Sequence, residues 1–170
     1  MKHKLLLIYS WLIRTLLFFL PDIPFIMRFR GWLYGLGMLH KGKNFQLAHS
    51  TILNTIEMIS VGENVYIANF CSIIANGNIT IGDNTLFGPG VVISSGNHRF
   101  EDGLFIKQSD KKDVAIGKNS WVAANCTIVG GSVLPESSIL AANSVLTSKL
   151  DETLAGCLYG GTPAKFIKKL

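Results

Sequence analysis

The chain has 170 residues, of which 48% are apolar and only 16% are charged, so it is neither a disordered nor a fibrous protein. Its length suits one domain with a sizeable core. Three cysteines, Cys71, Cys126 and Cys157, form no CxxC pair and no even set. This excludes a disulfide scaffold and a four-cysteine zinc site, and it favours a reducing, cytoplasmic setting.

The positive charge is concentrated at the N-terminus. Residues 1–43 hold seven lysines and arginines against one acid, Asp22, which is a net charge of +6. The rest of the chain carries nine basic and ten acidic groups. A nucleic-acid-binding protein more often carries its basic residues on the folded body, among aromatic side chains. The neutral body therefore argues against nucleic acid as a partner.

Residues 1–40 form an apolar, basic leader. The stretch from Leu5 to Leu20 contains Arg14 and is 16 residues long, shorter than the roughly 20 apolar residues that span a bilayer. A second stretch, Phe25 to Leu39, mixes arginines with Trp32. This mixture favours helices that lie in the headgroup layer of an anionic membrane. Two alternatives stay open: a lid of two helices packed on the body, and a spanning hairpin or secretory signal.

Residues 41–150 contain a repeat of six residues. The mark Gly-x-Asn recurs at Gly42, Gly62, Gly82 and Gly117. Between the marks a bulky apolar residue falls at every sixth position: Val61, Ile67, Ile73, Ile81, Phe87, Ile93, Ile116, Val122, Ile128, Leu134, Leu140 and Leu146. The position four residues after each is small or slim, as at Cys71 and Cys126.

A period of six fits neither a helix nor a simple hairpin. Three hexads make one triangular turn of a solenoid, whose stacked turns pair as parallel strands and bury one core. We therefore predict an all-β solenoid of about five turns, interrupted by a loop over residues 97–113. Residues 151–170 form a short C-terminal extension.

The repeat resembles that of the hexapeptide-repeat acyltransferases. Two stretches are similar to the galactoside and maltose O-acetyltransferase branch, VGENVYIANFCSIIANGNITIGDNTLFGPGVVISSGNH (residues 61–98) and IGKNSWVAANCTIVGGSVLPESSILAANSVLT (residues 116–147). The closing GGTPAKFIKKL is similar to the end of that family. The resemblance covers roughly residues 42–170. It implies a left-handed parallel β-helix, a homotrimer with active sites between subunits, and acetyl-CoA as co-substrate without a metal. Residues 1–40 are instead similar to the apolar leaders of surface-polysaccharide O-acetyltransferases.

His98 is the candidate general base. Moving an acetyl group from a thioester to a hydroxyl needs a base for the hydroxyl proton and a donor for the developing oxyanion. His98 opens the insertion, which can project over a neighbouring subunit, and by resemblance it matches the catalytic histidine of the family. Asn97, Glu101 and Asp102 flank it and are candidates for orienting the imidazole. The alternative is a solvated loop histidine.

The resemblance also assigns residues to the two substrates. Trp121 would line the cleft for donor and acceptor, unless it anchors a trimer interface, and Asn69 lies one position away from an acceptor-binding asparagine. The positions that match acetyl-CoA contacts are Ala124 and Ala142 for the pantetheine, Thr147, Ser148 and Lys149 for the nucleotide end, and Lys165 and Lys168 for the 3′-phosphate. In the Thr-Ser-Lys stretch, serine stands where the family has lysine.

The remaining histidines, His3, His40 and His49, are expected to lie outside the well-formed repeats and to pair with nothing, which argues against the zinc site of a β-helix carbonic anhydrase. The predicted function is acetyl-CoA-dependent O-acetylation of a sugar hydroxyl. The expected acceptor is a lipid-linked saccharide of surface polysaccharide or lipopolysaccharide biosynthesis, at the cytoplasmic face of the membrane. Two alternatives are a trimeric scaffold or membrane adaptor without catalysis, and an antibiotic-type acetyltransferase.

Overall fold

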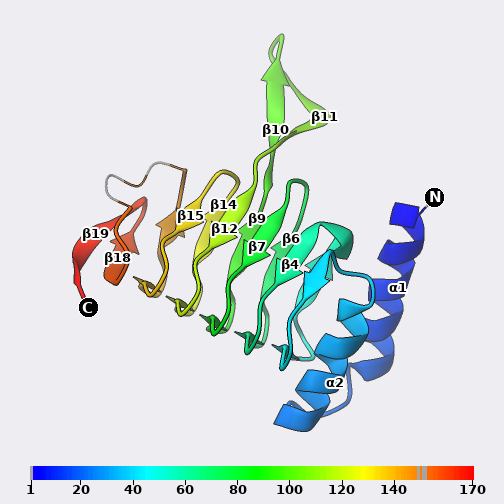
Figure 1. Cartoon of the computed structure of the whole chain (residues 1–170). Coiled ribbons are helices and arrows are strands. Elements are labelled where there is room, and N and C mark those ends of the chain that lie inside the picture. The colour runs from blue at the N-terminus through cyan, green and yellow to red at the C-terminus, as the bar shows by residue number, and fades with distance from the viewer. Residues whose placement is uncertain (1, 149, 151–152) are drawn as a thin grey trace.

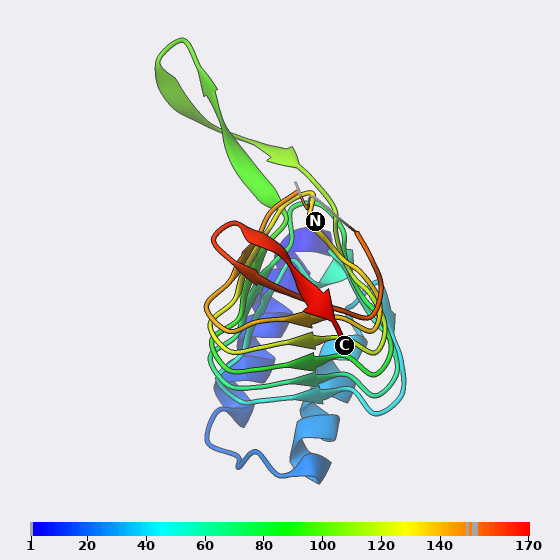
Figure 2. The same cartoon turned by 90° about the vertical axis from the view of Figure 1, so that its left-hand side faces the viewer.

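The computed structural model describes residues 2–148, 150 and 153–170. Two helices, α1 (Lys2–Leu17) and α2 (Pro24–Gly35), precede a triangular prism of short parallel strands (Figures 1 and 2). A hairpin of β10 (Gly96–Glu101) and β11 (Leu104–Lys111) leaves the prism as an arm. A second hairpin, β18 (Cys157–Gly161) and β19 (Ala164–Lys169), closes the C-terminal end.

Three sheets form the faces of the prism, and their strands are parallel except for β19, which pairs antiparallel with β18. The first sheet holds β1 (His40–Lys41), β4 (Ile59–Val61), β7 (Ile79–Ile81), β12 (Val114–Ile116) and β15 (Val133–Leu134). The second holds β2 (Gln46–Leu47), β5 (Tyr66–Ile67), β8 (Leu86–Phe87), β13 (Trp121–Val122), β16 (Ile139–Leu140), β18 and β19. The third holds β3 (Ile52–Asn54), β6 (Ser72–Ile74), β9 (Val92–Ser94), β14 (Thr127–Val129) and β17 (Val145–Leu146). A short 3-10 helix, Ile56–Met58, joins β3 to β4.

The hexad residues fill the interior of the prism. All twelve are at most 2% exposed, and the parallel register stacks them in columns, as when Val61 pairs with Ile81 and Ile81 with Ile116. In the described residues the strands complete five turns and β18 starts a sixth, so the predicted solenoid is confirmed. Cys71 and Cys126 are buried in narrow inward positions, as predicted. Burial raises the pKa of the Cys71 thiol to about 11, which makes it a poor nucleophile.

The Gly-x-Asn marks form the corner between the first and second sheets. A Cβ on Gly82 would lie 2.5 Å from the backbone nitrogen of Lys118 in the next turn, so glycine is required there. The asparagines have φ between 54° and 57°, a left-handed conformation that asparagine tolerates better than most residues. Their side-chain amides hydrogen-bond from turn to turn at 3.0–3.1 Å, through Asn44, Asn64, Asn84 and Asn119.

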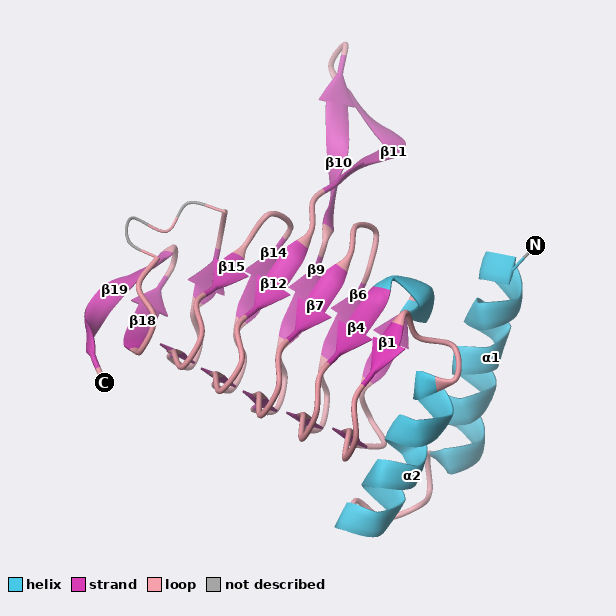
Figure 3. Cartoon of the chain, viewed as in Figure 1, coloured by secondary structure: helices cyan, strands magenta, loops and turns pink. Residues whose placement is uncertain are grey.

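The helices α1 and α2 cover the N-terminal end of the prism (Figures 1 and 3). Ile13 of α1 and Tyr34 of α2 join the hydrophobic core. Gly31 of α2 packs so closely on the body that a Cβ there would lie 2.2 Å from the carbonyl oxygen of Phe45. The leader therefore packs on the body, as the lid alternative predicts. None of the helices among the described residues is long and apolar enough to cross a membrane.

The predicted loop over residues 97–113 is an antiparallel hairpin for most of its length. The pairing runs from Gly96 opposite Lys111 to Glu101 opposite Leu104, with a register shift between His98 and Phe100. Three apolar side chains at its tip are largely exposed, and the rings of two of them lie 5.0 Å apart: Phe100, Leu104 and Phe105. The arm therefore carries apolar surface that the described residues of its own chain do not cover.

Candidate functional site

His98 lies on β10, near the base of the arm, and its side chain is exposed. Its register partner on β11 is Ser109. Its Nδ1 lies 3.3 Å from the carbonyl oxygen of Ile106, across the hairpin. Because a carbonyl oxygen only accepts hydrogen bonds, Nδ1 carries the proton in this contact and Nε2 is the basic nitrogen. A neutral imidazole that donates in this contact has its other nitrogen, Nε2, free to take a proton.

Of the polar residues that flank His98, Glu101 lies near another side chain and Asp102 lies at the tip of the arm. Glu101 lies 3.8 Å from Arg99, and Arg99 donates from Nε to Asp110 at 2.5 Å. This ion pair crosses the hairpin one residue away from His98 and supports the strand pairing. Asp102 lies at the tip of the arm, where its φ is 49°. Within the described part of the chain, the group that orients His98 is therefore a backbone carbonyl, which sequence patterns do not reveal.

Asn69, Ala124 and Ala142 lie in one column at the corner between the second and third sheets. The register of the second sheet stacks Ile67, Phe87, Val122 and Leu140, and each of these residues leads into this corner. The same corner position is taken in successive turns by His49, Asn69, Pro89, Ala124, Ala142 and Gly161. Asn143 donates its backbone N–H to the carbonyl oxygen of Ala124 at 3.0 Å. Small side chains expose the backbone here, so an extended chain such as pantetheine can lie along the corner.

Trp121 and two lysines lie on the same side of the prism as that column. Trp121 is on the outer face of the second sheet, 47% exposed, and pairs in register with Ile139. The next strand, β18, places Leu158 beside Ile139, and Lys168 of β19 lies opposite Leu158. Lys165 lies opposite Gly160, next to the corner that holds Ala142. The structure therefore brings together the predicted cleft wall, the pantetheine positions and the two lysines.

Thr147 and Ser148 lie elsewhere, at the corner between the third and first sheets. They follow β17 and line a small pocket of about 110 Å³ with Gly131 and Leu150. The arm that carries His98 leaves from the same corner, between β9 and β12. Lys149, predicted to act with them, is outside the described residues. In a triangular prism each corner lies opposite one sheet, and this corner lies opposite the second sheet. Within one chain, the corner that carries the arm of His98 and the sheet that carries Trp121 therefore lie on different sides of the prism.

The expectation that His3, His40 and His49 pair with nothing is wrong for two of them. Nδ1 of His49 lies 2.7 Å from a carboxylate oxygen of Asp22, and His3 lies 2.6 Å from Glu57. His49 also occupies a regular corner position of the first turn. The partners are 27 and 54 residues away in the chain, so a repeat pattern could not show these contacts.

Asp22, Arg30 and His49 form a polar clasp between the helices and the first turn. Arg30 is buried and donates from Nη1 to Asp22 at 3.0 Å and to the carbonyl oxygen of Leu47 at 2.5 Å, while its Nε has no hydrogen-bond partner among the described residues. Burial acts to raise the pKa of Asp22, but hydrogen bonds from His49 and the charges of His49 and Arg30 outweigh it and lower that pKa. A lone acid among seven basic residues was the one sequence signal of this cluster.

Known proteins share both the sequence and the fold of this chain, although no family model matches it. A protein of Escherichia coli K12 named "Putative lipopolysaccharide biosynthesis O-acetyl transferase WbbJ" is 26% identical over 156 residues, which are 85% of this chain and 78% of that protein. The structure of a maltose O-acetyltransferase from Clostridium difficile 630 is 25% identical with a TM-score of 0.79, and the match covers 98% of this chain and 89% of that one.

A third protein, a hexapeptide-repeat-containing acetyltransferase from Vibrio cholerae, was solved with acetyl coenzyme A. It has the same fold at 21% identity, with a TM-score of 0.76 over 98% of this chain and 88% of that one. The chain thus resembles named O-acetyltransferases in sequence and hexapeptide-repeat acetyltransferases in fold. Its prism is the left-handed parallel β-helix of these acyltransferases, with two helices at the N-terminus.

Proposed function

We propose that this acyltransferase moves the acetyl group of acetyl-CoA to a sugar hydroxyl, with His98 as general base. The observation that carries the proposal is the contact between Nδ1 of His98 and the carbonyl oxygen of Ile106, because it leaves Nε2 as the basic nitrogen. The acetyltransferase names of the relatives and the acetyl-CoA in the Vibrio cholerae structure support the choice of donor.

The transfer needs no covalent enzyme intermediate. Nε2 of His98 takes the hydroxyl proton while the sugar oxygen attacks the thioester carbonyl carbon. The carbon–sulfur bond then breaks, the acetyl group stays on the sugar oxygen, and the coenzyme A thiolate takes up the proton. In the proposed site, the backbone at Ala124 and Ala142 binds the pantetheine, Trp121 forms the cleft wall, and Lys165 and Lys168 bind the 3′-phosphate through charge-assisted hydrogen bonds.

The active assembly in this proposal is a homotrimer with its sites between subunits. The position of the arm's corner opposite the sheet that carries Trp121 supports a site in which one chain supplies His98 and its neighbour supplies Trp121. The exposed tip of the arm, with Phe100 and Phe105, supplies apolar surface that a neighbouring subunit would cover. Thr147 and Ser148 would then meet the nucleotide end of coenzyme A bound to a neighbour.

The proposed acceptor is a lipid-linked saccharide at the inner face of the membrane. Two observations support it: the lipopolysaccharide name of the Escherichia coli relative, and the apolar, basic helices at one end of the prism. The proposal places the enzyme in surface polysaccharide or lipopolysaccharide biosynthesis.

Acetyl transfer by a His98→Ala variant tests the catalytic assignment. We expect a loss of about 10²–10⁴-fold in kcat/KM, the usual contribution of a positioned base. Acetyl-CoA binding, measured by calorimetry on the same variant, should be unchanged. His40→Ala is the matched control, because His40 is an exposed histidine on β1 at the far N-terminal turn. A loss below tenfold would remove His98 from the mechanism. Absence of saturable acetyl-CoA binding to the wild type would favour a scaffold.

A further inference from the structure

Both helices carry an unpartnered apolar stripe. On α1 and just beyond it, Leu5, Ile8, Leu12, Leu16 and Phe19 follow helical spacing, and they range from 42% exposed at Leu12 to 90% at Phe19. On α2 and its C-cap, the same spacing exposes Phe25, Phe29, Trp32 and Leu36. The opposite faces of the helices pack on the prism through Ile13, Met27 and Tyr34, so the stripes face away from it. We call these nine exposed residues the end face.

The exposed charges around the end face are positive. Lys2, Lys4 and Arg28 are exposed beside the stripes. The one acid of the leader, Asp22, is held in the polar clasp by His49 and Arg30. Glu57, which lies against α1, is paired with His3. This end therefore combines apolar area with a surplus of cations.

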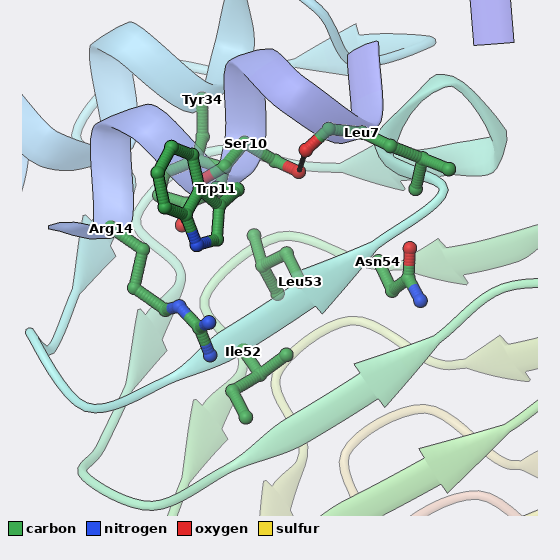
Figure 4. Close-up of a pocket in the computed structure, with 8 residues that line it drawn as sticks. All are labelled: Leu7, Ser10, Trp11, Arg14, Tyr34, Ile52, Leu53 and Asn54. Atoms are coloured by element: carbon green, nitrogen blue, oxygen red, sulfur yellow. Dashed lines mark hydrogen bonds between the residues drawn. The ribbon is translucent and has the colours of Figure 1, made fainter. Parts of the chain in front are cut away.

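Arg14 lies in a groove between α1 and the third sheet (Figure 4). Two adjoining pockets of about 160 and 340 Å³ share Arg14 and Ile52, and their walls include Trp11 and Phe18. Within the described ranges, no carboxylate forms an ion pair with Arg14. The groove lies on the side of α1 that faces the prism, so Arg14 is not part of the end face.

We propose that the end face docks on the headgroup layer of an anionic bilayer, with the exposed cations Lys2, Lys4 and Arg28 beside lipid phosphates. Trp11 and Trp32 suit this layer because their rings are apolar and their N–H groups can reach water. A second copy of the chain would bring two positive surfaces together, and like charges across an interface are unfavourable. The inference deepens the proposed location at the membrane, which is part of the proposed function, but it does not depend on acetyl transfer.

The polar clasp gives this docking a fixed orientation. Because Arg30 and Asp22 tie the α1–α2 connection to the first turn, the prism cannot pivot freely about the helices. The arm leaves the side of the prism, away from the end that the helices cover (Figures 1 and 2). A docked molecule therefore keeps its arm and its side faces in the aqueous layer beside the membrane, within reach of a headgroup-linked saccharide.

Co-sedimentation of the full chain with lipid vesicles tests the proposal. We expect binding to vesicles that contain phosphatidylglycerol, weaker binding at high salt, and little binding to pure phosphatidylcholine. The double variant Ile8→Asp/Leu16→Asp should lose the binding. Its matched control, Leu170→Asp, changes an exposed leucine at the other end of the chain and should bind like the wild type.

Charge variants test the anionic preference separately. Lys2→Gln/Lys4→Gln/Arg28→Gln should lower the partition onto phosphatidylglycerol vesicles by about 100-fold, since each cation near the surface contributes roughly fivefold. Arg14→Gln alone should change it much less, because Arg14 lies on the other side of α1 from the end face. Lys107→Gln, on the arm, is the matched control and should change nothing.

Three results would overturn the proposal. They are no binding of the wild type to anionic vesicles, equal binding of the wild type to neutral vesicles, and binding as strong as that of the wild type by Ile8→Asp/Leu16→Asp or by the triple charge variant. Light scattering could instead show twice the mass of the proposed trimer. If Ile8→Asp/Leu16→Asp returned that mass to the trimer value, the end face would be assigned to a second copy of the protein. Circular dichroism confirms that each variant is folded. Acetyl-CoA calorimetry on the same samples separates the docking proposal from the proposed acetyl transfer. A sample that binds acetyl-CoA but not the vesicles counts against the docking proposal alone.

Discussion

Asp22 and His98 show how single side chains in this molecule are positioned by distant backbone and charge. His98 is oriented by a carbonyl from the other strand of its hairpin. Asp22 receives two hydrogen bonds from His49 and an ion pair from Arg30. In each case the residue type was visible in the sequence, while the partner that gives it a defined state came from elsewhere in the chain.

The clasp predicts an acid-sensitive stability. The pKa of Asp22 is lower in the folded protein than its ordinary value, so its contribution is complete above about pH 4, the unfolded value, and is lost as the pH falls through the folded value. Asp22→Asn should cost roughly 3 kcal/mol at neutral pH, because buried Arg30 loses its counter-charge. Urea unfolding at neutral and acidic pH measures both effects.

The control is Asp102→Asn, which makes the same change at the exposed tip of the arm. It should leave the unfolding free energy nearly unchanged. An Asp22→Asn variant with wild-type stability at neutral pH, or with the same decline in acid as the wild type, would contradict the role of the clasp.

At the scale of elements, the corners of the prism and the arm differ in what stabilises their conformation. The corners of the prism are supported by the next turn, through backbone pairing and the asparagine ladder. The arm has only two strands, and an isolated two-stranded hairpin is marginally stable in water. Its shape therefore depends on what its apolar tip contacts.

The asparagine corner predicts a graded response at Asn84. Asn84→Ala forces alanine into a left-handed conformation and removes two amide hydrogen bonds, so we expect a loss of about 2 kcal/mol of stability. Asn84→Gly keeps the backbone conformation accessible and should cost about half as much. Thermal or urea unfolding compares the two variants. Equal losses would show that the backbone conformation contributes nothing at this corner.

At the scale of the whole molecule, the separation of His98 from Trp121 makes assembly the central question. Within one prism, the corner that carries the arm lies opposite the sheet that carries Trp121. The same prism carries its helices at one end and its arm on one side, so the proposed docking and the proposed assembly would use different surfaces (Figure 1).

Light scattering in mild detergent should give a protein mass of three 18.6 kDa chains. Phe100→Ser/Phe105→Ser should weaken this trimer, because it removes the apolar tip that a neighbour would cover. Leu170→Ser is the matched control and should stay trimeric. A wild-type protein that is monomeric and still transfers acetyl groups would rule out sites shared between subunits.

The sequence by itself determined the solenoid, its turns and the placement of the insertion, because a period of six leaves one way to bury every bulky residue. It also determined the positive, apolar N-terminal end, since charge and hydropathy belong to the residues themselves. Only the tertiary structure decided that Asp22 pairs with His49 and Arg30, that Ile106 orients His98, and that His98 and Trp121 lie on opposite sides of the prism. These contacts depend on register and on how the chain winds in space, which a linear pattern does not contain.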